Sequence, residues 1–387
     1  MYKEQILNNL SEDVASASNL KVPAAMLIGG FSLLVFLILP SYIGALAGLG
    51  FNDNQLGYLA SMDLAGITTA SLISVLFIKK INWRILSLTS LIALIGLNML
   101  CINQNDYPSL LTLRFCSGVA GGLVLVISYS VISASRDPDR NIAIFVATQV
   151  LFQTIGFLCV PLLTENWGVN GFYWVFSVAS VICLVLVPLL PAKRHDENPT
   201  HKASDKTKAL PTFLILIAMT LFFAGQGSIW GFGEIIGQAG GLSSAETSNA
   251  LAFTSFTALF GAGLAAWMSN RFGRFWPILI AIAVQCAMTL NFHGEMSAIY
   301  YLIVFAIFSF GWNFGISFQV GALCDTDPEG RFAALVPAFQ GAGLAIGPAL
   351  GGAFLTGDGY YTVNLISFFA LVLYLVLILP LTRNRAA

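Results

Sequence analysis

Residues 193–208 read KRHDENPTHKASDKTK, a charged stretch that separates two long series of apolar segments. Six apolar segments precede it and six follow it. A helix that crosses the hydrocarbon core needs about 20 apolar residues, and most of the segments reach this length. We therefore predict an all-α membrane protein with twelve transmembrane helices, near residues 22–48, 55–78, 85–103, 109–134, 142–163, 171–190, 210–236, 246–269, 275–292, 298–323, 333–356 and 361–382.

The composition supports a membrane protein. Of the 387 residues, 57% are hydrophobic and only 10% are charged, and the mean hydropathy is +0.81. A soluble fold of this composition would have too little polar surface. A β-barrel is excluded, because its strands would be shorter and would alternate polar with apolar residues. The net charge of −1 indicates no particular partner, and no basic patch suggests nucleic acid.

The basic residues predict the orientation in the membrane. The chain has 18 Lys and Arg residues. Apart from Arg114, they lie at the termini or in every second connection between the apolar segments. The intervening connections carry none. Because basic residues near helix ends are retained on the cytoplasmic side, we expect both termini to be cytoplasmic. The connections without Lys or Arg lie near residues 49–54, 104–108, 164–170, 237–245, 294–297 and 357–360.

The same pattern predicts the domain boundaries. Residues 1–20 are polar and acidic, and the first apolar segment is long enough to remain as a span, so we expect no cleavable signal peptide. The predicted parts are a cytoplasmic tail 1–21, a six-helix bundle 22–191, a cytoplasmic linker 192–209, a second six-helix bundle 210–382 and a tail 383–387.

The two halves are related by an offset of 191 residues without a gap. The offset aligns residues at equivalent points of the two bundles, pairing Gly50 with Gly241, Lys80 with Arg271, Arg140 with Arg331, Gln149 with Gln340 and Gly156 with Gly347. We interpret this as duplication of a six-helix unit in parallel topology. Two similar bundles can rock about a site at their interface. The duplication therefore favours a carrier over a channel or a membrane enzyme.

Three ionisable residues are predicted at membrane depth, where a charge costs several kcal/mol unless it is paired or hydrated. Arg114 breaks the charge pattern, and Asp63 in the second span lies at a similar depth, which makes it the natural partner. Glu234 lies toward the outer end of the seventh span. We predict proton coupling by Asp63, Arg114 and Glu234. The alternatives are a snorkelling arginine, a permanent structural ion pair and a hydrated carboxylate at the rim.

Amides and aromatic residues in the spans are the candidate substrate ligands. Phe222, Gln226, Trp230 and Glu234 recur at intervals of four and so share one helix face, which is typical of a cavity lining. Amides bind polar solutes, but they also hold helices together. The predicted substrate-binding residues are Tyr42, Gln149, Gln153, Gln226, Trp230, Glu234, Phe256, Trp312, Asn313 and Gln340.

The sequence predicts no enzyme, cofactor or metal site. The six cysteines and three histidines are scattered, and the cysteines form no C-x-x-C pair, so free thiols are expected. No G-x-x-x-x-G-K-[ST] loop indicates ATP as the energy source, and no H-E-x-x-H or G-x-S-x-G site indicates hydrolysis.

Local motifs resemble the major facilitator superfamily over nearly the whole chain. Residues 266–274 read AWMSNRFGR, similar to the family loop G-x-L-x-D-R-x-G-R with Asn in place of Asp, and residues 79–84, KKINWR, are a degenerate copy. In the family this loop latches helices on the cytoplasmic side. The resemblance implies a cytoplasmic gate at Lys80, Asn270, Arg271 and Arg274.

Two further motifs resemble efflux members of this family. Residues 110–118 fit L-x-x-x-R-x-x-x-G, with Arg114 at the position that the family associates with proton coupling. Residues 343–352, GLAIGPALGG, match the G-x-x-x-G-P-x-x-G-G motif of drug:proton antiporters, although here it lies in the eleventh span and not in the fifth. The resemblance is closest to arabinose-efflux-like and drug-efflux-like members, and it implies a modest preference for export.

The leading hypothesis is a proton-coupled secondary transporter of a small organic solute, monomeric, in a bacterial inner membrane. Its expected partners are the solute, protons and the lipid bilayer. Three alternatives stay open. They are an importer of a sugar, amino acid or metal chelate, a sensor that does not transport, and a lipid or lysolipid flippase. The flippase hypothesis predicts a lateral opening with apolar walls and a headgroup site near Arg114.

Overall fold

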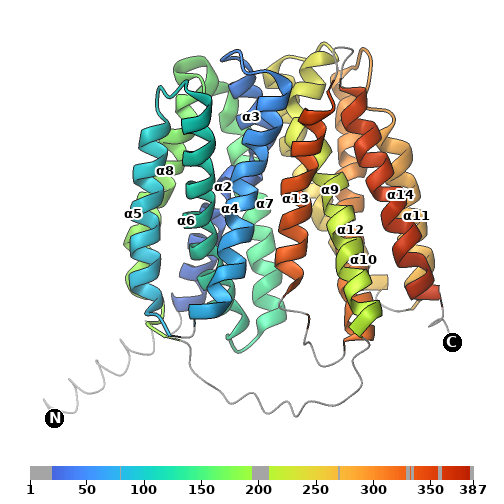
Figure 1. The fold of residues 1–387 in the computed structure, drawn as a ribbon, viewed down its shortest axis with the longest axis horizontal. Coiled ribbons are helices and arrows are strands. Elements are labelled where there is room, and N and C mark those ends of the chain that lie inside the picture. The colour runs from blue at the N-terminus through green and yellow to red at the C-terminus, as the bar shows by residue number, and fades with distance from the viewer. Residues whose placement is uncertain are drawn as a thin grey trace, which may run out of the picture.

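The computed structural model describes residues 20–78, 80–193, 209–268, 271–327, 332, 335–355 and 360–383. Within these ranges the regular structure is helical throughout, as the composition predicted. Figure 1 shows long helices running side by side as a bundle, with their connections at its two ends.

The helices before the linker form the first half of the bundle. Most of them follow the predicted spans within a few residues. Their bounds are Leu20–Ser32, α2 Leu34–Leu37, α3 Leu39–Ala47, α4 Asp53–Phe77, α5 Trp83–Cys101, α6 Tyr107–Ser133, α7 Pro138–Trp167, α8 Asn170–Leu186 and the short 3₁₀ helix η1 Val187–Leu189.

The helices after the linker form the second half. Their bounds are α9 Ala209–Ala239, α10 Ser244–Met268, α11 Phe275–Thr289, α12 Ala298–Thr326, α13 Val336–Ala353 and α14 Tyr361–Arg383. Gly241, in the first connection of this half, has a φ of 93°, and Gly50 in the first half has a φ of 86°. The two glycines that the offset pairs therefore make the same left-handed turn, which glycine adopts without steric cost.

Polar residues fix where several helices begin. Asn52 and Gln55 form a reciprocal capping box at the start of α4. Asp106 caps α6 by accepting a hydrogen bond from the Ser109 backbone N–H at 3.0 Å. The hydrogen bonds from Ser109 lower the pKa of the Asp106 carboxyl. A negative charge is thereby kept at a helix N-terminus, where the helix dipole stabilises it.

Nine helices in the described part of the chain are long and apolar enough to cross a membrane. The predicted count of twelve is therefore not confirmed by length and composition. The ninth predicted span is a helix of only 15 residues, α11. The eleventh, α13, has 18 residues and is not among the nine candidate spans.

The first predicted span, 22–48, is not one helix, and this corrects the prediction. It is interrupted at Leu33 and again at Ile38, between the helices Leu20–Ser32, α2 and α3. Pro40 stands at the start of α3. A proline has no backbone N–H for the carbonyl four residues earlier and clashes with it. The chain therefore cannot continue α2 directly into α3.

The two halves meet along α4 and α13, α7 and α10, and α3 and α9. Small residues allow close contact. A Cβ at Gly57 of α4 would lie 2.8 Å from the Gly352 Cα of α13 and would overlap the Pro348 carbonyl. The Tyr360 hydroxyl also donates a hydrogen bond to Asp53 Oδ1 across the halves, at 2.9 Å.

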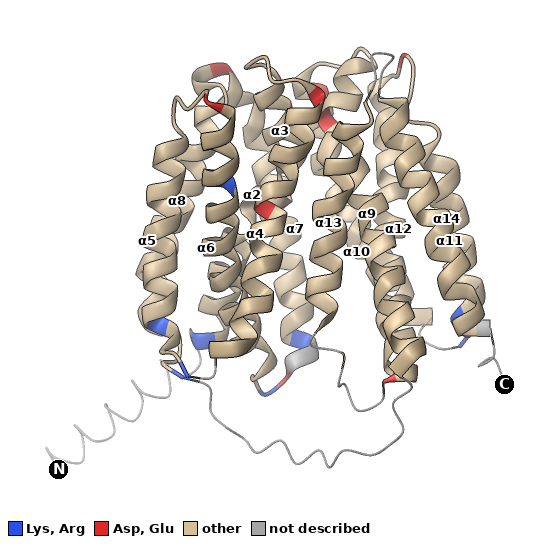
Figure 2. Ribbon diagram, in the orientation of Figure 1, with Lys and Arg blue, Asp and Glu red and all other residues tan. Residues whose placement is uncertain are grey.

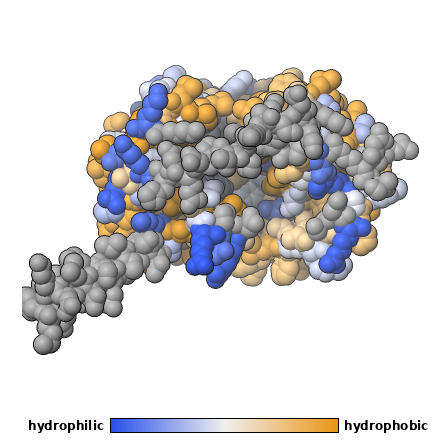
Figure 3. Space-filling model, turned by 90° about the horizontal axis from the view of Figure 1, so that it is seen from below, coloured by the Kyte–Doolittle hydropathy of each residue, from blue (hydrophilic) through white to orange (hydrophobic). Residues whose placement is uncertain are grey.

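Charge is distributed unevenly along the bundle. Figure 2 shows most Lys and Arg at one end, which we call the basic end, and many Asp and Glu at the opposite end. Seen from the basic end, hydrophilic residues gather in patches among apolar ones (Figure 3). The connections after α3 and α9 lie at the opposite end, so the contact between Asp53 and Tyr360 does too.

Candidate functional site

Arg114 is a fully buried cation in α6, and it forms an ion pair with Asp63, the carboxyl that lies at a similar depth. Its side chain has 0% exposure, and that of the partner Asp63 in α4 has 4%. Arg114 Nε donates to Asp63 Oδ2 at 2.8 Å and Nη2 donates to Oδ1 at 2.6 Å. Arg114 Nη1 donates to Asn98 Oδ1 of α5 at 2.9 Å. Such a two-pronged contact matches the planar fork of the guanidinium.

Aromatic rings surround this ion pair. The Arg114 Cζ lies 5.4 Å from the ring centre of Tyr42 and 5.9 Å from those of Tyr173 and Phe176. The hydroxyls of Tyr42 and Tyr173 are 3.1 Å apart. The electron-rich faces of such rings attract the cation. A cavity of about 20 Å³ beside the pair is lined by Asn98 and Ser117 among others, and both carry a buried polar atom without a hydrogen-bond partner among the described residues.

Glu234 of α9 is a second buried carboxyl, with 1% exposure. It accepts hydrogen bonds from Ser244 Oγ at 2.6 Å, Gln238 Nε2 at 3.0 Å and Ser248 Oγ at 3.3 Å. All three donors are neutral. Among the described residues the salt bridges are those of Arg114 and Arg274, so none joins Glu234 to a cation.

Glu234 also lies against the other half of the bundle. A Cβ at Gly44 of α3 would lie 3.0 Å from the Glu234 carboxyl carbon. The hydroxyl oxygens of Ser41 in α3 and Ser248 in α10 are 3.3 Å apart. The Glu234 carboxyl is thus enclosed only while α3 and α9 stay together at the end opposite the basic one.

Trp230, one helical turn before Glu234, joins the halves through the broken first span. Pro40 leaves the Phe36 carbonyl without its helical donor, and Trp230 Nε1 donates to this carbonyl at 3.0 Å. Within the hydrocarbon region such a carbonyl must find its partner in the protein. The Trp230 ring centre lies 6.0 Å from those of Phe157 and Trp312 and 6.5 Å from that of Phe36.

The amides predicted as substrate ligands separate into two groups. Gln226 is fully buried and forms an amide pair with Gln285 of α11, with Gln226 Nε2 donating to Gln285 Oε1 at 3.1 Å. This pair holds two helices of one half together. Four others are half-buried, namely Gln149, Gln153, Asn313 and Gln340. Gln149 Nε2 has no hydrogen-bond partner among the described residues, whereas Asn313 Nδ2 donates to Ser309 O at 3.2 Å.

Phe256 is not gathered with the other predicted ligands. It is 44% exposed on α10, on the same side as the exposed Phe253 and Phe260, and it lies outside the aromatic cluster of Trp230. An apolar ring on a membrane helix is stable facing lipid tails, so nothing requires it to turn inward.

The family of this chain follows from its sequence over most of its length. The family model of the Major Facilitator Superfamily matches residues 23–322. The chain belongs to the Major Facilitator Superfamily.

Solved structures of the superfamily share the fold. A bacterial homologue of the human lysosomal transporter Spinster, inward-facing and unoccupied, has a TM-score of 0.66 at 16% identity, covering 95% of this chain and 96% of that one. The nucleoside transporter NupG has a TM-score of 0.69 at 14% identity, covering 96% and 99%. At these identities the likeness shows the fold alone. No curated protein matches the chain.

The loop residues that the superfamily resemblance singled out lie at the basic end. Arg274 forms a two-pronged ion pair with Asp325 of α12, at 2.6 and 2.9 Å. Arg271 lies 5.6 Å above the ring of Trp267, and Lys80 is exposed. Asn270 lies outside the described residues. The second copy of the loop thus fastens α11 to α12 within one half.

Several site residues were missed by the sequence analysis. Asn98 completes the Arg114 contacts, and its signal was a lone amide within the apolar third span. Tyr173 carried the same signal as Tyr42, because each is an aromatic residue with a polar hydroxyl inside a span. The serines around Glu234, at positions 41, 244 and 248, had no usable signal, because serine is common in membrane helices.

The Trp230 hydrogen bond gives the first testable prediction. Trp230→Phe keeps the ring but removes the donor to Phe36 O. The net worth of such a bond is about 0.5–1.5 kcal/mol, so the population with separated halves should rise by about two- to tenfold. Spin labels at Leu49 and Ala239, both exposed at the end opposite the basic one, report this as a longer distance.

Trp276→Phe is the matched control, because Trp276 is 61% exposed on α11. Its distance distribution should equal that of the unsubstituted chain. An unchanged distribution in Trp230→Phe as well would mean that this bond does not hold the halves together.

Proposed function

We propose that this superfamily member is a proton-coupled secondary transporter that moves a small organic solute by alternating access. The proposal includes a bacterial inner membrane, cytoplasmic termini and a monomer. The superfamily fold and its transporter neighbours support carriage of a solute. The choice of protons rests on the arrangement of buried carboxyls.

The observation that carries the proposal is Glu234, a buried carboxyl with neutral donors at the contact of the two halves. An ionised carboxylate in a dry site costs several kcal/mol unless it is paired. Binding a proton removes this cost, and separation of α3 from α9 removes it by hydration. Protonation and closure of this end are therefore expected to favour one another, which is what coupling requires.

Asp63 and Arg114 have a different part in the proposal. Their charges neutralise one another within the first half, and Tyr42 and Tyr173 cover them. A proton on Asp63 would release one arm of the Arg114 fork. Coupling through this pair therefore requires the α4–α6 contact to change, whereas coupling through Glu234 requires only that the halves separate.

The substrate is proposed to bind between the halves, near Trp230, Trp312, Gln149 and Gln340. The two tryptophans stand at the contact of the halves, and the amides come from α7 and α13, one in each half. Aromatic faces with neutral hydrogen-bonding groups suit an amphipathic or polar organic molecule. Export is the proposed direction, from the efflux-like motifs.

The direct test is a flux assay on the purified chain in liposomes with an internal pH dye. Solutes from a library are added under an imposed proton gradient. A solute-dependent pH change that is lost in Glu234→Gln supports the proposal, and its sign reports export or import. Silence across the library with a folded, inserted chain would contradict it and favour the sensor, lipid transport or another coupling ion.

The paired amides give a second prediction. Gln149→Ala and Gln340→Ala should each weaken solute affinity by about two- to tenfold, the worth of one hydrogen bond, while expression and insertion stay normal. Solute titrations in the flux assay measure this. Asn166→Ala, an exposed amide at the end of α7, is the control and should leave affinity unchanged. Unchanged affinity in both glutamine variants would assign these amides to helix packing.

A further inference from the structure

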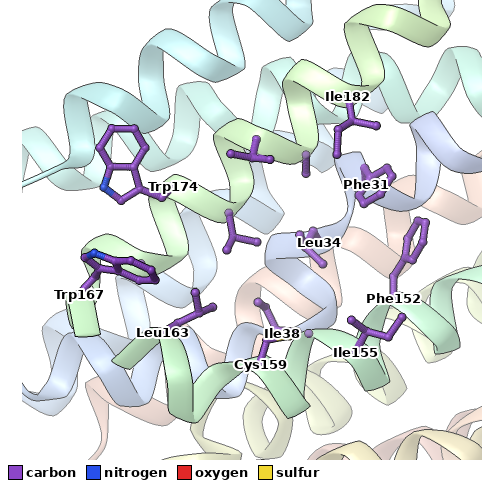
Figure 4. A pocket seen from close by; sticks show the side chains of 15 residues that line it. Phe31, Leu34, Ile38, Phe152, Ile155, Cys159, Leu163, Trp167, Trp174 and Ile182 are labelled. Carbon is purple, nitrogen blue, oxygen red and sulfur yellow. The ribbon is translucent and has the colours of Figure 1, made fainter. Parts of the chain in front are cut away.

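The first half contains an apolar groove that the transport proposal does not use. Its volume is about 510 Å³, and its walls are the broken first span, α7 and α8. Figure 4 shows Trp167 and Trp174 at one end of the groove and Phe31 and Phe152 at the other. The volume lies within the range of about 300–1,000 Å³ that is typical of ligand sites.

A difference between the two halves creates this groove. In the second half, glycines at 343 and 347 let α13 pack on the backbone of α9, against Thr220 O and Ala224 O. The offset of 191 residues places Phe152 where the second half has Gly343. Phe152 stacks on Phe31, with ring centres 4.3 Å apart, and a Cβ at Gly30 would lie 2.7 Å from its ring. The ring holds α7 away from the first span.

The groove opens on the outside of the bundle. Its wall residues Ile155, Val178 and Ile182 are 50%, 56% and 45% exposed. Both α7 and α8 include candidate membrane spans, so in a bilayer the mouth of the groove faces hydrocarbon. None of the residues that line it carries a charge. Its lining includes the small residues Gly156, Cys159 and Gly171, which leave room in it.

The end marked by the two tryptophans is expected to lie at a membrane–water interface. Trp167 is the last residue of α7 and is 59% exposed, and Trp174 lies in the second turn of α8 and is 47% exposed. Tryptophan is enriched at this depth, because its ring is apolar and its N–H is polar. A molecule in the groove would therefore have its apolar part beside Phe31 and Phe152 and its polar part beside the indoles.

We propose that this groove binds one acyl chain of a membrane phospholipid from the leaflet opposite the basic end. The acyl chain is the apolar group available along the whole mouth, and the headgroup stays at the level of Trp167 and Trp174. Selection acts on the chain and not on the headgroup, because the lining has no charged residue. The bound chain lies against α2 and so supports the broken span that supplies Phe36 to Trp230.

The test uses variants that fill the groove with a larger side chain and counts the lipid that each variant retains. Cys159 is exposed on α7 inside the groove, and Cys116 is exposed on α6 and does not line it. Each lies roughly 12–14 Å along its helix from the end opposite the basic one, at 1.5 Å per residue. Cys159→Phe and Cys116→Phe are therefore a matched pair that adds the same ring at the same depth.

The full chain is purified from vesicles of phosphatidylethanolamine and phosphatidylglycerol, and native mass spectrometry counts retained lipid. We expect Cys159→Phe to retain one lipid fewer than the unsubstituted chain and Cys116→Phe to match it. In detergent, phosphatidylcholine with brominated acyl chains should quench tryptophan fluorescence saturably. Loss of the space for two methylene groups should weaken this binding by about tenfold in Cys159→Phe.

Val178→Phe fills the groove from α8 and replaces Cys159→Phe if that variant does not fold. Trp167→Phe with Trp174→Phe should remove the saturable quenching. Unchanged lipid count and quenching in a monodisperse filling variant would overturn the proposal. A second contradicting result would be equal quenching of tryptophan fluorescence by a brominated single-chain detergent together with no retained phospholipid. The groove would then be ordinary apolar surface. These readouts do not depend on transport.

Discussion

Glu234→Gln is expected to abolish proton-driven solute flux while leaving the protein folded and inserted. Glutamine keeps the size of the side chain. Its amide oxygen can accept from Ser244 and its amide N–H can donate to the Ser248 hydroxyl, so the closed contact of α3 and α9 is preserved. What it removes is the ability to gain and lose a proton when the halves separate. The measurement is solute flux against an imposed proton gradient, together with solute exchange in the absence of a gradient.

The two measurements distinguish coupling from simple loss of function. Exchange should persist in Glu234→Gln at a rate within about tenfold of the unsubstituted chain, because binding and rocking need no proton when the carboxyl is permanently neutral. Glu246→Gln is the matched control, since Glu246 is exposed in the first turn of α10 and its hydrogen bonds to Ser243 suit glutamine equally. Gradient-driven flux at the normal level in Glu234→Gln would remove this residue from the coupling mechanism.

Asp63→Asn is expected to have the largest effect on stability. It leaves the Arg114 guanidinium buried without its counter-ion, and removal of one partner from a buried pair costs about 3–5 kcal/mol. A lower thermal unfolding temperature in detergent measures this cost, and gradient-driven flux should also be lost. Asp106→Asn is the control, because Asn caps a helix about as well as Asp and this site is exposed.

The double variant Asp63→Asn with Arg114→Gln separates a coupling pair from a structural one. Neutralising both partners removes the uncompensated charge, so most of the stability should return. If the pair takes part in coupling, flux stays lost although the fold is restored. Recovery of both stability and gradient-driven flux would show that the pair is a permanent structural contact.

Asp63 could be named from the sequence as the natural partner of Arg114, because charge is rare and costly at membrane depth, but their contact is seen only in the structure. Once the spans were placed, one cation and one carboxyl remained at a similar depth in the first half, and the free energy of burying either alone is prohibitive. By contrast, the contribution of Asn98 was not predictable. A lone amide in a span is compatible with many partners, and only the packing of α5 on α6 brings it to Arg114.

The interruption of the first span was also beyond prediction by hydropathy. The segment 22–48 is apolar throughout, and hydropathy averages over the position of Pro40. As a consequence, the Phe36 carbonyl lacks its helical donor and accepts a hydrogen bond from Trp230, which is 194 positions away in the sequence. The groove beside α7 could not be predicted for a similar reason. The effect of Phe152, which stands where the second half has a glycine, depends on which helix it faces.

The sequence by itself determined the class of protein, its helical bundle and the depth of its ionisable residues. These follow from hydropathy, span length and the placement of charge, each of which is read along the chain. The tertiary structure alone decided which carboxyl is paired with a cation and which rests on neutral hydroxyls at the contact of the two halves. The reason is that an electrostatic environment depends on neighbours in space. The hydrogen-bond donors to Glu234 come from α9 and α10, and α3 packs against its carboxyl at Gly44.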